Sequence, residues 1–176
     1  GPNAPAVFAP LRFKYMDIDV GLSSAPVIVD VNQDGLQDIL VGERQGNINY
    51  FMNTGSVGSP QFLADVNAGG NVNRLAEIST RAAGFLIGNS SPLVFYQNDQ
   101  AYLILGSEQG AIQLYRSSDR RLDGELLLID EQVGNYRAGR GSSAALTDMD
   151  QDGFLEMLVG NARGGLQLNN TPFLAT

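Results

Sequence analysis

Residues 23–53 read SSAPVIVDVNQDGLQDILVGERQGNINYFMN, and residues 142–170 read SSAALTDMDQDGFLEMLVGNARGGLQLNN. Both stretches run from a Ser-Ser pair through an acidic loop to an apolar segment that ends in Val-Gly, and an alternating segment follows. Residues 90–115 read SSPLVFYQNDQAYLILGSEQGAIQLY and keep this plan without the acidic loop. Self-similarity of this kind predicts three copies of one structural repeat.

The spacing of the copies predicts β-sheets of about four strands each. The glycines that close the apolar segments, Gly42, Gly106 and Gly160, lie 64 and 54 residues apart, which suits one propeller blade with its connections. Short apolar segments bounded by Gly, Asn and Ser indicate the individual strands. They fall near residues 26–31, 37–42, 47–53, 61–66, 92–97, 101–106, 111–116, 125–130, 143–148, 155–160 and 165–169. Residues 74–80 fit either a helical turn or an additional strand.

We therefore expect an all-β chain that forms a single, partial β-propeller domain over residues 1–176, with about three four-stranded antiparallel blades. The repeats span approximately residues 23–87, 88–140 and 141–176, and residues 8–20 supply a possible closing strand. Closed rings have about four to eight blades, so the chain is either a fragment of a larger ring or half of a homodimer. An immunoglobulin-like sandwich is the alternative, but it gives no reason to repeat one loop at this spacing.

Composition narrows the possible chemistry. The chain has no Cys and no His, which excludes disulfides, thiolate zinc sites and Ser-His-Asp catalysis. No apolar run approaches the roughly 18 residues of a membrane span, so membrane insertion is not expected. Seven of the 19 acidic residues lie in residues 30–38 and 148–156, and the other 12 nearly balance the 11 basic residues. A general basic surface for nucleic acid is therefore not expected either.

Both acidic loops match the pattern D-x-[DN]-x-[DN]-G-x-x-[DE]. In such a loop, oxygens at positions 1, 3 and 5 converge on one ion, Gly permits the sharp turn, and position 7 presents its backbone carbonyl. The predicted ligands of the first loop are Asp30, Asn32, Asp34, the carbonyl of Leu36, and Asp38. Those of the second loop are Asp148, Asp150, Asp152, the carbonyl of Phe154, and Glu156. Oxygen donors without nitrogen or sulfur favour Ca²⁺ over Zn²⁺, so we predict two Ca²⁺ sites.

The order of these features (Ser-Ser, apolar strand, acidic loop, apolar strand, Val-Gly) resembles the FG-GAP/VCBS-type repeats of integrin α heads and of many bacterial secreted proteins. The resemblance covers nearly the whole chain and is specific in the first and third copies. Because the second copy lacks the acidic loop, no metal is expected there. The resemblance implies a β-propeller with structural calcium that is secreted or exposed on the cell surface, as in bacteria. It also implies that the protein recognises a protein or carbohydrate ligand in adhesion.

Two other function classes stay open beside this binding module, which would not be an enzyme. One is an accessory or catalytic part of a secreted polysaccharide-degrading enzyme, a lyase or glycosidase that works through carboxylates, Tyr or Arg. Outside the acidic loops its candidates are found only by elimination: Asp17, Asp19, Glu43 and Glu108. The other class is a structural spacer within a large surface protein.

Overall fold

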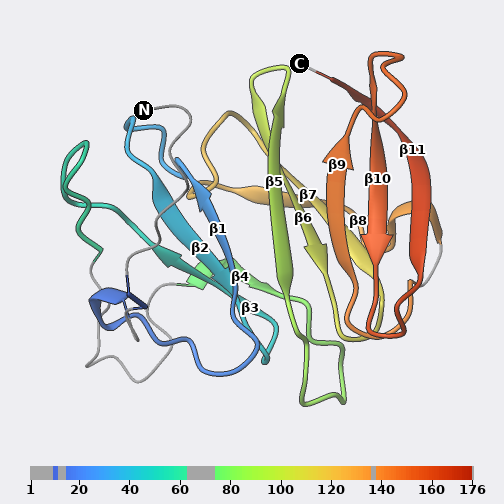
Figure 1. Ribbon diagram of the computed structural model, residues 1–176, viewed down its shortest axis with the longest axis horizontal. Helices are drawn as coiled ribbons and strands as arrows, with labels where there is room; N and C mark the ends of the chain where they lie inside the picture. Colours follow the sequence, from blue (N-terminus) through green and yellow to red (C-terminus); the bar gives the residue numbers. More distant parts are fainter. Residues whose placement is uncertain (1–9, 12–14, 63–73, 136–137, 176) are drawn as a thin grey trace.

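Three antiparallel β-sheets lie side by side in the order of the chain (Figure 1). They belong to a computed structural model that describes residues 10–11, 15–62, 74–135 and 138–175. The first sheet contains β1 (Ala25–Val29), β2 (Asp38–Gly42), β3 (Asn47–Phe51) and β4 (Arg74–Ser79). The second contains β5 (Ser91–Gln97), β6 (Gln100–Gly106), β7 (Ile112–Ser117) and β8 (Leu126–Asp130). The third contains β9 (Ser143–Thr147), β10 (Phe154–Gly160) and β11 (Leu166–Leu174).

The described chain is therefore all-β, as the sequence predicts, and helical structure is limited to two short 3₁₀ turns, η1 (Tyr15–Asp17) and η2 (Val133–Asn135). Within each sheet, strands that are consecutive in the sequence are hydrogen-bonded neighbours. The first strands of successive sheets contact each other, β1 with β5 and β5 with β9. No helix among the described residues is both long and apolar enough to cross a bilayer.

The first two strand pairs of every sheet share one register. The glycine that ends the second strand faces the first residue of the first strand: Gly42 faces Ala25, Gly106 faces Ser91, and Gly160 faces Ser143. On its other side, the same glycine faces an apolar residue of the third strand: Ile48, Ile112 or Leu166. Residues at matching positions of the three aligned stretches consequently occupy matching positions of the three sheets.

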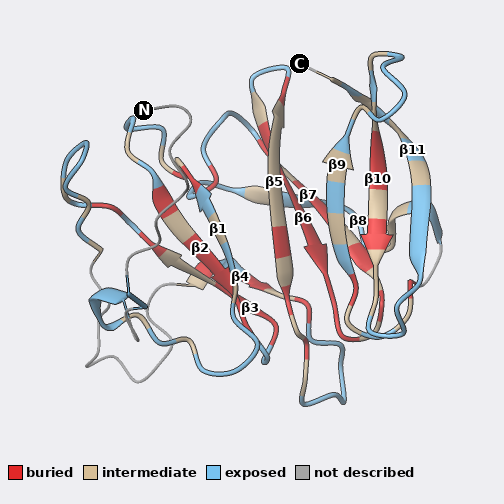
Figure 2. Ribbon diagram, viewed as in Figure 1, coloured by how far each residue is buried: buried red, intermediate tan, exposed pale blue. Residues whose placement is uncertain are grey.

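Two apolar cores hold the sheets together, one on each face of the second sheet. Buried residues, red in Figure 2, mark β2, β6 and β10 in the three sheets. Side chains of a strand point alternately to the two faces, and β6 uses both. Leu103 and Leu105 lie in the core shared with the first sheet, whereas Tyr102 and Ile104 lie in the core shared with the third. The first core also contains Val29, Val31, Leu40, Ile48, Leu75, Ile78, Ala101, Tyr115 and Leu122. The second also contains Ile112, Leu114, Ala138, Met157 and Val159.

The fourth strand of the first sheet differs from the prediction. Instead of running over residues 61–66, it is β4, Arg74–Ser79, which is the additional strand that residues 74–80 allowed. After β3 the chain folds into a tight loop in which Thr54 N donates to Gln61 O at 2.8 Å, and Phe62 makes only a single bridge, to Asn53. Residues 63–66 lie outside the described residues. The prediction of a strand at 61–66 is therefore wrong for its described part.

β4 is irregular, which explains its helix-like sequence. Leu75 and Ile78 are 2% and 7% exposed and lie in the same core although they are three residues apart. Ala76 and Glu77 between them have φ angles of 50° and 54°, and the register with β3 shifts at this point. Between the pairs Asn47–Ser79 and Asn49–Arg74, β4 advances five residues while β3 advances two, so β4 carries three extra residues and a spacing typical of a helix serves a strand.

The segment before the first sheet shows no strand in its described part. Residues 10–11 and 15–20 contain only the 3₁₀ turn η1, and the remainder of residues 8–20 lies outside the described residues. The role of that segment as a closing strand stays a prediction.

Candidate metal centres

The first acidic loop joins β1 to β2 and is shaped by its own carboxylates. Asp30 Oδ2 accepts a hydrogen bond from Gly35 N at 2.9 Å, and Asp34 Oδ1 accepts one from Leu36 N at 2.8 Å. Gln33 and Gly35 have φ angles of 59° and 90°, the left-handed region in which glycine is unstrained. The alternation of right- and left-handed residues turns the backbone amides toward the carboxylates.

The second acidic loop joins β9 to β10 and repeats this arrangement. Asp148 Oδ2 accepts from Gly153 N at 3.1 Å, and Asp152 Oδ1 accepts from Phe154 N at 2.8 Å. Gln151 and Gly153 have φ angles of 62° and 91°. The two loops therefore share backbone geometry and hydrogen bonds, although 118 residues separate Asp30 from Asp148.

The last acidic residue of each loop also plays a matching part. Val31 N donates to Asp38 Oδ2 at 3.0 Å, and Met149 N donates to Glu156 Oε2 at 2.6 Å. Asp38 and Glu156 are 0% and 4% exposed. Each lies on the second strand of its sheet and fastens the beginning of the loop to that strand.

The second loop gathers carboxylates into a cluster that fits a cation. Carboxylate oxygens of Asp148, Asp150 and Glu156 lie within 4.8 Å of one another. Asp148 Oδ1 is buried and has no hydrogen-bond partner, an arrangement that is unfavourable unless a ligand completes it. Negative groups this close repel one another, and a bound cation would remove the repulsion. All donors are hard oxygens, which suits Ca²⁺, although the cluster by itself does not single out that ion.

The first loop does not form such a trio in the described structure: Asn32 stands where the second loop has Asp150, and Asp38 has more hydrogen-bond partners than Glu156. The second oxygen of Asp38, Oδ1, accepts from Asn53 N at 2.7 Å, and Tyr50 Oη donates to Oδ2 at 3.3 Å. Among the described residues, the only group of three or more acidic side chains close enough to share an ion is the one in the second loop. Asn32 and Asp34 instead bond to each other, Asn32 Nδ2 donating to Asp34 Oδ2 at 3.0 Å.

The electrostatics of Asp38 reflect this buried position. Burial raises the pKa of the Asp38 carboxyl, while the amides of Asn53 and Val31 and the hydroxyl of Tyr50 act in the opposite direction and the charge of Asp34 adds to the increase. Burial and the neighbouring Asp38 together raise the pKa of Tyr50 far above its ordinary value. The Tyr50 hydroxyl thus keeps its proton and remains a hydrogen-bond donor.

The contacts that the first acidic loop makes with the second repeat were not predicted from the sequence. Tyr96 Oη of β5 donates to Asp30 O at 3.2 Å, and the Arg120 guanidinium lies 4.5 Å from the centroid of the Tyr96 ring. Gln33 Nε2 donates to Tyr96 Oη at 3.5 Å, and Leu122 N donates to Val31 O at 2.8 Å. Partners so distant in sequence leave no local pattern by which they could be found.

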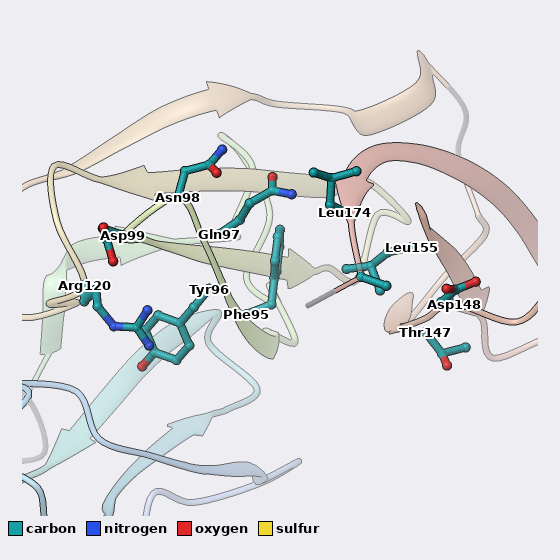
Figure 3. Close-up of a pocket in the computed structure, with 11 residues that line it drawn as sticks. Phe95, Tyr96, Gln97, Asn98, Asp99, Arg120, Thr147, Asp148, Leu155 and Leu174 are labelled. Carbon is teal, nitrogen blue, oxygen red and sulfur yellow. The ribbon is translucent and has the colours of Figure 1, made fainter. Parts of the chain in front are cut away.

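A pocket of about 680 Å³ opens between the second sheet and the second acidic loop (Figure 3). Figure 3 shows Arg120 against Tyr96 on one side of this pocket and Asp148 with Thr147 on the other. The remaining walls carry amide, carboxylate and apolar side chains, contributed by Phe95, Gln97, Asn98, Asp99, Leu155 and Leu174. Polar side chains and two aromatic residues, Phe95 and Tyr96, therefore share the walls of this pocket.

The two buried carboxylates considered for catalysis, Glu43 and Glu108, are engaged in hydrogen bonds and an ion pair. Glu43 is 4% exposed and accepts hydrogen bonds from the amides of Gln45 and Asn47 and from the Asn47 side chain. Glu108 is 9% exposed, accepts from Asn89 and pairs with Arg140. Glu43 thus supports the turn that follows β2, and Glu108 joins side chains from the segments that precede β5 and β9.

The chain matches no protein-family model, no curated protein and no solved structure.

Proposed function

We propose that this chain is a calcium-stabilised part of a β-propeller that serves extracellular recognition, with a protein or carbohydrate as its ligand. The observation that carries the proposal is the second acidic loop. There, three carboxylates approach within 4.8 Å of one another, and a buried oxygen of Asp148 has no partner. Its hydrogen bonds recur in the first loop at the matching place of another sheet.

The arrangement of the sheets supports the propeller. Each of two successive pairs of sheets packs face to face, and the first strands of neighbouring sheets are in contact. The second sheet uses one face toward the first sheet and the opposite face toward the third, so the three succeed one another in a single direction. Radial repetition of sheets that bury both faces is the construction principle of a propeller.

Calcium would hold each hairpin together from within. In the second loop the ion would be bound by Asp148, Asp150, Asp152, Glu156 and the Phe154 carbonyl. In the first loop it would be bound by Asp30, Asn32, Asp34, Asp38 and the Leu36 carbonyl. The bound charge would offset carboxylate repulsion and tie β9 to β10 or β1 to β2. Extracellular calcium modules bind with Kd values of about 10⁻⁴–10⁻³ M, so millimolar calcium outside cells would fill them.

Two features support the recognition role: the polar side chains of the pocket, and a sequence without the imidazole and thiol groups that many enzymes use. The pocket in Figure 3 presents Gln97, Asn98 and Arg120 beside the Tyr96 ring, which are groups that bind hydroxyls and sugar rings. Imidazole and thiol groups are missing from the whole sequence. No contact of Glu43 or Glu108 favours the enzyme alternative, since the Glu43 carboxylate accepts from backbone amides of a turn and the Glu108 carboxylate accepts from the side chains of Asn89 and Arg140.

Scanning calorimetry with and without calcium tests the proposal directly. At a calcium concentration ten times Kd, one site adds about 1.4 kcal/mol, which for a chain of this size raises Tm by about 3–6 °C. We expect Asp148→Asn to remove the contribution of its loop, because Asn keeps the acceptor for Gly153 N but not the charge. Glu125→Gln, which removes an exposed charge outside the loops, should leave the calcium shift intact.

Two further arms sharpen the outcome. Titration calorimetry of the wild type should give two calcium ions per chain, and magnesium at the same concentration should raise Tm less. A glycan array probed in calcium and in chelator would then identify a carbohydrate ligand. A wild-type chain whose Tm ignores calcium and which binds none in titration would refute the metal centres.

A further inference from the structure

Neighbouring sheets are joined at their Gly-ended strands by a specific junction, seen first between the first and second sheets. Ser90 Oγ accepts from Glu43 N at 2.9 Å and donates to Asn47 O at 2.6 Å, and Ser90 N donates to Glu43 O at 3.1 Å. Gly42 lies so close to Ser90 that a Cβ atom at position 42 would overlap the Ser90 carbonyl. The serine thus fills the turn that follows β2.

The same junction joins the second sheet to the third. Ser142 Oγ accepts from Ser107 N at 2.9 Å and donates to Ala111 O at 3.1 Å, and Ser142 N donates to Ser107 O at 3.0 Å. A Cβ atom at Gly106 would overlap the Ser142 carbonyl. Positions Ser107 and Ala111 follow Gly106 at the same intervals at which Glu43 and Asn47 follow Gly42.

Both halves of a third junction are present in the described chain, and they do not meet each other; Gly165 O accepts from Asn161 Nδ2 at 3.2 Å. Gly160 ends β10 as Gly42 ends β2, but the nearest atom to a Cβ there would be Leu166 Cδ2 at 3.7 Å. The turn at 162–165 is exposed. Ser24 precedes β1 as Ser90 and Ser142 precede β5 and β9, yet it is exposed, whereas those two serines are each 2% exposed.

The free faces of the two outer sheets complement these halves. Residues opposite one another in an antiparallel pair share a face. On the third sheet, Leu158 lies opposite Leu168 on the face turned away from the second sheet, and Leu168 and Leu166 are 54% and 70% exposed. On the first sheet, Ile28 and Val41 lie on the face turned away from the second sheet; Ile28 is 69% exposed, whereas Val41, beside residues 15–21, is 4% exposed.

We propose that a second copy of this chain docks head to tail, with its first sheet on the free face of the third sheet and its Ser24 in the turn after Gly160. The interface would continue the junction that occurs twice within the chain, with Asn161 N and Gly165 O in the places of Ser107 N and Ala111 O. Such a contact is heterologous and forms a closed ring only if the rotation between copies allows it. Two copies would contribute six sheets, which lies within the range of about four to eight in closed rings.

One segment must move for this docking. Residues 15–21 lie beside the open face of the first sheet, where Tyr15 and Ile18 line a pocket with Pro26 and Val41. Displacing them opposes association, so we expect copies to associate at high rather than low protein concentration. The junction itself does not involve the acidic loops, and the docking therefore stands apart from the calcium proposal.

Sedimentation equilibrium of the full chain over a wide concentration range tests the docking. The wild type should rise from the monomer mass of 18.8 kDa toward twice that value or beyond. Gly160→Ala should lose this association, because the new methyl group would meet Ser24 of the second copy as a Cβ at Gly106 meets Ser142. Gly124→Ala is the matched control, since its Cβ would have no atom within 4 Å, and it should associate as the wild type does.

Folding and calcium are monitored in the same series. Gly160→Ala should keep the wild-type circular dichroism and Tm, since the methyl group fits the isolated chain. Each measurement is made in calcium and in chelator, so that loss of the calcium effect is seen in Tm and loss of docking in mass. A wild type that stays monomeric at every concentration, or a Gly160→Ala chain that associates as the wild type does, would overturn the docking.

Discussion

The acidic residues of the two loops divide into those that support the backbone and those that are free to bind. Asp38 has both oxygens occupied by hydrogen bonds from Val31, Asn53 and Tyr50. Asp150 is exposed and accepts one bond, from Asp152 N at 3.2 Å. The motif therefore combines residues that stabilise the fold without an ion, such as Asp38, with residues that are available to bind one, such as Asp150.

Replacing Asp38 with Ala should weaken the fold whether or not calcium is present. The amides of Val31 and Asn53 would lose their acceptor in a buried place, which lowers the free energy of unfolding by about 2–4 kcal/mol. Urea unfolding in calcium and in chelator measures this loss. The matched variant Asp150→Ala should leave stability in chelator unchanged or higher, because it relieves carboxylate repulsion. Equal stability of Asp38→Ala and wild type in chelator would contradict the structural part assigned to Asp38.

At the scale of strands and turns, the serines that open the second and third repeats act on the sheet before them. Ser90 and Ser142 bond to the turns after β2 and β6, not to the strands that they precede. The glycine at the end of β2 or β6 makes room for them. Serine and glycine therefore recur together because each junction needs a small residue on one sheet and a hydroxyl on the next.

Ser90→Ala should lower the free energy of unfolding by about 1–3 kcal/mol, since the buried Glu43 amide would lose its acceptor. Ser142→Ala should have a similar effect through the amide of Ser107. Ser118→Ala, at an exposed position, is the control and should stay within about 0.5 kcal/mol of the wild type. Chemical unfolding followed by circular dichroism compares the three, and a neutral Ser90→Ala would mean that the junction contributes no stability.

At the scale of the whole molecule, the second sheet is the shared support of both cores. Leu103 is buried against the first sheet, and Ile104, the next residue, is buried against the third. Two cores that meet on one strand are expected to unfold together, because neither outer sheet can bury its inner face without the middle one.

Leu103→Ala and Ile104→Ala should each destabilise the entire chain by about 2–5 kcal/mol, as large-to-small changes in a core do. Both variants should keep a single unfolding transition that calorimetry and circular dichroism report at the same temperature. Leu127→Ala, where the side chain is 48% exposed, should have a much smaller effect. Separate transitions, with each variant shifting only one, would indicate that the sheets unfold independently.

Local patterns in the sequence were sufficient for the class of the fold, most strands and the shape of the acidic loops. Alternating apolar segments bounded by glycine predict strands, and the bonds that form each loop, such as Gly35 N to Asp30, join residues only a few positions apart. Such features depend on interactions between near neighbours, which the sequence displays directly.

Tertiary structure alone decided the rest. β4 is a strand because Leu75 and Ile78 complete a core made by distant residues, against their helix-like spacing. Asp38 is occupied because Asn53 and Tyr50 fold back onto it, and Tyr96 reaches Asp30 from the next sheet. The physical reason is the same in each case: burial and hydrogen bonding between remote segments outweigh local preference, and they exist only once the sheets have packed.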